Sequence, residues 1–127
     1  MPPSGKPTDR RSSGLLRVPF VQRCSLQFDD GKTASAFLVN INVLGAYVAR
    51  DDLPLLGQAV TCSFRTPDND SELILEGVVA WVNPHQQHPV HSLPPGFGIK
   101  FERLPPADLK RIERLVRTYV SRRPSVR

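Results

Sequence analysis

The segment TASAFLVNINVLGAYVAR, residues 33–50, contains two runs of the kind that form β-strands, separated by the turn NINVLG at residues 40–45. Both runs are rich in apolar and β-branched residues, and turn-forming residues lie between them. The turn carries Asn40, Asn42 and Gly45 around an apolar pair. Such a turn either serves only to reverse the chain or presents polar groups to a ligand, and the segment alone leaves both interpretations open.

The sequence on either side of this segment predicts four more strands, because apolar residues recur at alternate positions or in long apolar runs. Gln22 is the one polar exception on the apolar face of the first strand. The apolar faces consist of Val18, Phe20, Cys24, Leu26 and Phe28; then Val60, Cys62 and Phe64; then Leu73, Leu75, Val79 and Trp81; and then Phe97, Ile99 and Phe101. Six strands are therefore expected in all.

The hydrophobic period changes after Leu104, where the apolar residues recur at helical spacing. They are Leu109, Ile112, Leu115, Val116, Tyr119 and Val120. We expect one amphipathic helix over residues 105–122, with Pro106 in its first turn. A single helix cannot cover both faces of a flat six-stranded sheet. The sequence thus predicts a mainly β fold, a six-stranded antiparallel barrel or split barrel with the C-terminal α-helix against its side or mouth.

The length of 127 residues is typical of one domain, and the 39% apolar and 23% charged residues are ordinary for a globular protein. We expect a flexible N-terminal tail at residues 1–10, the domain at 11–122 and a basic tail at 123–127. No apolar stretch is long enough for a membrane span or a secretory signal, which predicts a cytoplasmic location. Cys24 and Cys62 lie in apolar patterns, so we expect buried, reduced thiols.

The net charge of +5 is concentrated at the two ends of the chain. A solvated helix face and two tails account for it without a specific partner. A small nucleic-acid-binding barrel is the other interpretation of a basic protein. Its stacking surface requires aromatic residues interleaved with basic ones, whereas the aromatic residues here alternate toward the expected core. Nucleic acid is therefore not the expected partner.

The sequence contains no recognisable catalytic motif, neither paired carboxylates nor a nucleophile with its base, so we do not expect an enzyme. His85, His88 and His91 have a repeated spacing, but no acidic or cysteine ligand stands nearby, and we expect neither a metal nor another cofactor. Trp81 offers a surface on which a base can stack. Its place on the apolar face of a strand favours packing in the core instead.

Several segments, in this order, resemble those of PilZ domains: RVPF, NINVLGAYV, LPLLGQAVTCSFR, EGVVAWVNP and PPGFGIKFERLPPADLKRIERLV. The resemblance covers residues 11–119. It implies a six-stranded barrel with a C-terminal helix, and a site for the bacterial second messenger cyclic di-GMP. That site combines an R-x-x-x-R pair before the first strand with a D/N-x-S-x-x-G turn between the second and third strands.

The resemblance carries over to this chain only in part. Arg17 matches the second arginine, Asn40 the first position of the turn motif and Gly45 its glycine. Ser13 stands where the first arginine is expected, and Asn42 replaces the serine. Arginine pairs with phosphate and reads the guanine edge, so Arg10 or Arg11 would have to replace the missing one. The candidate ligand-binding residues are Arg10, Arg11, Arg17, Asn40, Asn42 and Gly45.

The expected function is that of a non-catalytic signalling adaptor that regulates a partner protein in pathways linked to cyclic di-GMP, such as motility, surface behaviour or exopolysaccharide production. Binding of cyclic di-GMP is expected to be weak or lost. The alternative is a true cyclic di-GMP receptor that uses Arg10 or Arg11 together with Arg17. The exposed face of the helix and the loop at residues 83–95 are the expected contact surfaces for the partner, since neither is needed to close the barrel.

Overall fold

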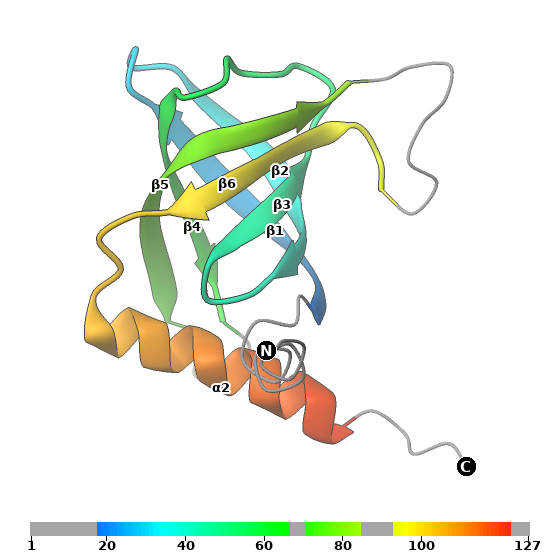
Figure 1. Ribbon diagram of the computed structural model, residues 1–127, viewed down its shortest axis with the longest axis vertical. Coiled ribbons are helices and arrows are strands. Elements are labelled where there is room, and N and C mark those ends of the chain that lie inside the picture. The colour runs from blue at the N-terminus through cyan, green and yellow to red at the C-terminus, as the bar shows by residue number, and fades with distance from the viewer. Residues whose placement is uncertain (1–17, 67–70, 85–92, 123–127) are drawn as a thin grey trace, which may run out of the picture.

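The computed structural model describes residues 18–66, 71–84 and 93–122. Its strands are β1 (Val18–Phe28), β2 (Thr33–Ile41), β3 (Gly45–Ala49), β4 (Ala59–Arg65), β5 (Glu72–Asn83) and β6 (Gly96–Phe101), followed by the helix α2 (Pro106–Arg122). The strands close into one barrel in the order β1-β2-β3-β6-β5-β4, and every neighbouring pair is antiparallel (Figure 1). The mainly β fold and the barrel predicted from the sequence are confirmed.

The barrel interior is filled by the apolar face of each strand. In β4 the predicted face is buried as a set, with Val60, Cys62 and Phe64 each no more than 3% exposed. Cys24 and Cys62 are both buried and free, as expected. A hydrogen bond between them lowers the pKa of Cys24 against the opposing effect of burial. The two thiols therefore belong to the packed core.

The helix α2 lies across the end of the barrel at which β1 begins (Figure 1). It starts at Pro106, one residue later than predicted, and buries Ile112 and Val116 against the core. Arg111 fixes it to the β4–β5 connection. The Arg111 guanidinium donates to the Thr66 hydroxyl at 3.0 Å and to the Ser71 hydroxyl and carbonyl oxygens at 2.7 Å and 3.0 Å.

One prediction about the core is wrong. Trp81 does not pack inside the barrel with Leu73, Leu75 and Val79, because the pairing of β5 with β6 shifts between Val79 and Trp81. A β-bulge of this kind adds a residue to one strand and reverses the side to which later residues point. Trp81 consequently lies on the outer face of the barrel, 38% exposed.

Candidate functional site

The turn at residues 42–44 joins β2 to β3 at the same end of the barrel as α2 (Figure 1). The Asn42 side chain is 4% exposed, and its Oδ1 atom accepts hydrogen bonds from the backbone amides of Leu44 at 2.8 Å and Gly45 at 3.0 Å. The backbone amide of Asn42 in turn donates to the Gly45 carbonyl oxygen at 2.9 Å. This is an Asx turn, in which an asparagine side chain satisfies the amides of the reversal that it begins.

Gly45 begins β3 and is buried against β6. A Cβ atom at this position would overlap the carbonyl oxygen of Ile99 in the neighbouring strand. The backbones of the two strands therefore approach so closely that only glycine fits. The glycine of the turn motif is explained by sheet packing alone, whether or not a ligand binds beside it.

Asn40 is half-buried near the end of β2 and belongs to a row of residues that crosses four strands. It pairs with Tyr47 of β3; Tyr47 pairs with Gly98 of β6, and Gly98 pairs with Trp81 of β5. The Tyr47 and Trp81 rings stack with their centroids 5.3 Å apart and their planes inclined by 31°. The indole also lies against Gly98, and a Cβ atom on Gly98 would overlap the Nε1 atom of Trp81.

Buried polar contacts hold the aromatic stack in place. Tyr47 is fully buried, and its hydroxyl donates to the Pro94 carbonyl oxygen at 2.6 Å and accepts from Asn83 Nδ2 at 3.1 Å. Burial raises the pKa of Tyr47 above its usual value of 10.0, and the Asn83 hydrogen bond partly offsets that rise. Asn83 itself is 4% exposed. The stack is thus a fixed surface, with the outer side of the Trp81 indole open to solvent.

The predicted arginines lie before the first described residue. Arg10, Arg11 and Arg17 fall outside the described residues, as does Ser13, so their role stays a prediction. Val18, the first described residue, pairs with Ile41, and Pro19 pairs with Asn40. Arg17 directly precedes Val18. The structure therefore brings Asn40, Asn42 and Gly45 together beside the start of β1.

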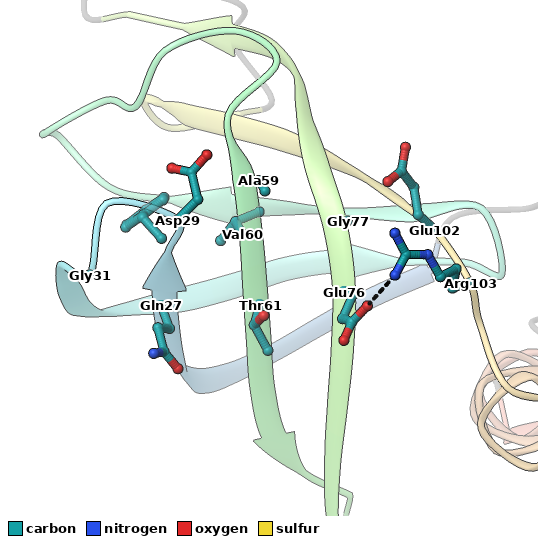
Figure 2. Close-up of a pocket in the computed structure, with 11 residues that line it drawn as sticks. Gln27, Asp29, Gly31, Ala59, Val60, Thr61, Glu76, Gly77, Glu102 and Arg103 are labelled. Carbon is teal, nitrogen blue, oxygen red and sulfur yellow. Dashed lines mark ion pairs between the residues drawn. The ribbon is translucent and has the colours of Figure 1, made fainter.

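Three hollows on the described surface lie elsewhere on the barrel. The one in Figure 2 has a volume of ≈ 440 Å³ and is lined by residues of the end of β1, the β1–β2 turn, β4, β5 and the segment that follows β6. Its charged groups are three carboxylates, those of Asp29, Glu76 and Glu102, against the single cation Arg103. Arg103 pairs with Glu76 at 3.9 Å, and both side chains are exposed. The negative charge of this hollow disfavours a dianionic nucleotide.

The part of the chain that the structure describes contains no cluster of three histidine, cysteine or acidic side chains placed to hold a metal ion. His85, His88 and His91 lie outside the described residues. Nor does any helix within the described ranges have the length and apolarity needed to cross a membrane.

The PilZ domain family matches residues 9–118 of this chain. The fold is similar to the "PilZ domain with c-di-GMP of YcgR from Escherichia coli", with a TM-score of 0.65, 9% sequence identity and coverage of 84% of this chain and 89% of that one. It is also similar to the PilZ domain of CeSA from a cellulose synthesizing bacterium, with a TM-score of 0.57, 14% identity and coverage of 79% and 93%. No curated protein matches the chain. At these identities the similar structures show the fold alone. The family match, in contrast, spans most of the chain.

Proposed function

The chain belongs to the PilZ domain family, and on this basis we propose that it is a non-catalytic cytoplasmic adaptor in bacterial cyclic di-GMP signalling. It regulates a partner protein and binds cyclic di-GMP weakly or not at all. The pathways concerned are those of motility, surface behaviour or exopolysaccharide production. The proposal depends chiefly on one observation, the hydrogen bonding of Asn42 within the β2–β3 turn.

Asn42 stands where the family motif has serine, and its Oδ1 atom accepts from the amides of Leu44 and Gly45. A phosphate or a guanine oxygen approaching this turn needs amide donors of that kind. The amides of Leu44 and Gly45 already have the Asn42 side chain as acceptor. Moving that side chain away breaks both hydrogen bonds, and a buried polar group left without a partner costs about 1–3 kcal/mol. The natural side chain therefore competes with the nucleotide.

The second departure from the motif acts in the same direction. Ser13 supplies neither the charge nor the planar fork of an arginine. A charge-assisted hydrogen bond is worth ~1.5–3 kcal/mol, so its loss alone weakens binding roughly 10- to 100-fold. Arg10 or Arg11 compensates only in part, because a side chain outside the motif register loses more conformational freedom on binding.

The partner protein is expected to contact the exposed face of α2 and the β5–β6 connection. The outward side of α2 carries Lys110, Arg114 and Arg117, all exposed. Neither segment contributes a strand to the barrel, so a partner can bind there without opening the fold.

Isothermal titration of cyclic di-GMP into the purified protein tests the nucleotide part of the proposal. We expect little or no heat with the natural chain. The double variant Ser13→Arg with Asn42→Ser should bind at least tenfold more tightly, from the ~1.5–3 kcal/mol of the restored arginine alone. Arg17→Ala in the repaired background is the matched control and should remove the gain. Tight binding by the natural chain would overturn the proposal.

A cyclic di-GMP receptor is the second candidate, and the position of Trp81 favours it. The exposed indole and Asn40 lie in the same cross-strand row. That row therefore offers a base both an amide for its hydrogen-bonding edge and an aromatic surface for stacking. Stacking of a base on an aromatic side chain contributes about 1–3 kcal/mol. Trp81 is the chain's only tryptophan, so its fluorescence reports on this surface directly. Saturable quenching by cyclic di-GMP at low concentration, lost in Arg17→Ala, would support the receptor.

A further inference from the structure

The two ends of the barrel carry opposite charges and each exposes apolar side chains. The β1–β2 turn and the β3–β4 connection, residues 50–58, lie together at the end opposite α2 (Figure 1). We call the surface at this end the leucine end; it consists of Asp29, Asp30, Asp51, Asp52, Leu55 and Leu56. The helix surface consists of Lys110, Arg114, Arg117 and Val120 of α2.

Leu55 and Leu56 are 77% and 63% exposed, yet the backbone that carries them is firmly held. Gly57 donates its amide to the Val79 carbonyl oxygen at 2.8 Å, and Val79 donates to the Gln58 carbonyl oxygen at 2.9 Å. The Gln58 side chain accepts from the Leu55 amide at 3.1 Å and donates to the Asp29 carboxylate at 3.2 Å. A fixed loop that presents two adjacent leucines to solvent is typical of a contact surface, since little ordering entropy is lost when it binds.

Acidic side chains surround the leucines. The four aspartates of the leucine end are all exposed, against one lysine, Lys32, and one arginine, Arg50, which pairs with Asp52 at 3.4 Å. An excess of negative charge around an apolar contact selects a partner surface that is apolar and basic.

The helix surface has that chemistry. Between Pro106 and Val120 the helix carries four basic residues, Lys110, Arg111, Arg114 and Arg117, against the two acidic residues Asp108 and Glu113. Val120 is 43% exposed and lies beside Arg117 at the edge of the basic side, whereas Ile112 and Val116 are buried in the core. Tyr119 is 36% exposed but lies on the opposite side of the helix from Lys110, so it is not part of the helix surface.

We propose that the leucine end of one molecule binds the helix surface of a second copy of this chain, so that copies associate head to tail. The contact joins two different surfaces, so each dimer leaves one of each kind open and can extend into longer chains. Because each surface offers only a few side chains, we expect a weak, reversible interface. The proposal does not depend on nucleotide binding, but it uses the same face of α2 as the proposed partner contact, so a bound partner should compete with self-association.

Sedimentation velocity of the full-length protein over a wide range of concentrations tests the association. The weight-average mass should rise above that of the 14.2 kDa monomer with concentration. It should fall back with added salt, as the Debye length shrinks from ~10 Å at 0.1 M to ~3 Å at 1 M. A protein that stays monomeric at every concentration in low salt overturns the proposal.

Two variants separate head-to-tail contact from other modes of association. Leu55→Ser with Leu56→Ser removes the leucine end, and Arg114→Glu with Arg117→Glu removes the helix surface; each should weaken self-association tenfold or more. Mixed together, they should form a dimer that grows no further, since each keeps the surface the other lacks. Circular dichroism and thermal melting confirm that both are folded.

Ile74→Ser is the matched control, because Ile74 is 57% exposed on the barrel wall, outside both surfaces. It should associate like the natural chain. Three results would contradict head-to-tail contact: association that survives both double variants, a mixture of the two that stays monomeric, and an Ile74→Ser protein that no longer associates.

Discussion

The Asx turn at the candidate site makes a quantitative prediction about stability. Asn42→Ala removes the Oδ1 atom that accepts from the Leu44 amide at 2.8 Å and the Gly45 amide at 3.0 Å. The contact with Gly45 is buried, and a buried donor left without a partner costs about 1–3 kcal/mol. The Leu44 contact is partly buried, so water can replace its acceptor. We expect the free energy of unfolding to fall by about 2 kcal/mol, which lowers the melting temperature by roughly 10 °C in a domain of this size.

Equilibrium unfolding in urea, followed by Trp81 fluorescence, measures this loss directly. Asn42→Asp is the matched variant, because a carboxylate keeps the acceptor for both amides. Burial of its charge offsets part of this gain, and we expect it to lose less stability than Asn42→Ala does. Leu44→Ala is the second control; the Leu44 side chain is 56% exposed, so its truncation should change stability little. The reasoning is refuted if Asn42→Ala is as stable as the natural chain, or if Asn42→Asp loses as much as Asn42→Ala does.

Three further predictions concern the barrel itself. Gly45→Ala should lower the free energy of unfolding, measured by urea unfolding, by about 2 kcal/mol or more, because the added Cβ atom overlaps the Ile99 carbonyl oxygen. An unchanged urea midpoint would mean that β3 and β6 can move apart at little cost in free energy. Arg111→Ala should cost about 1–3 kcal/mol, and Arg111→Lys should recover little of it, because lysine lacks the fork that spans Thr66 and Ser71; full recovery by lysine would show that charge alone holds the helix. The raised pKa of Tyr47 means that the unfolded chain loses the hydroxyl proton first, so the stability this group contributes is present below about pH 10 and is lost as the pH rises through its folded pKa. Tyr47→Phe should be less stable at neutral pH and lose less stability above pH 10, and parallel pH profiles for the two proteins would contradict this assignment.

The strands and the helix were predictable because their apolar residues keep a regular period. In β4 alternation alone identified the three side chains that the barrel buries. In α2 the same reasoning identified the buried side, but not where the barrel stops covering it. Tyr119 and Val120 fit the helical period as well as Ile112 does, yet they stay partly exposed. Period determines the direction of a side chain, whereas burial also requires a surface opposite it.

Trp81 shows where this kind of prediction fails. Its place in the apolar pattern of β5 holds only while the pairing register holds, and the bulge between Val79 and Trp81 breaks it. A bulge depends on the contacts of both strands, and the close fit of Gly98 beneath the indole is visible only in the folded barrel. Glycine in a strand is the one signal that pointed this way, because it often marks a bulge or a close approach.

The turn at residues 40–45 left two interpretations open in the sequence, and its geometry connects them. The Asn42 side chain stabilises the turn by occupying the amides of Leu44 and Gly45, which are the groups that a nucleotide at this turn would use. A serine hydroxyl makes such turn contacts more weakly than an asparagine amide does. Asn42→Ser, alone, should therefore reduce stability by about 1 kcal/mol and raise affinity for cyclic di-GMP at the same time. Urea unfolding and calorimetry on this one variant measure both effects. A loss of stability without any gain in affinity would show that Asn42 serves the turn alone and does not compete with the ligand.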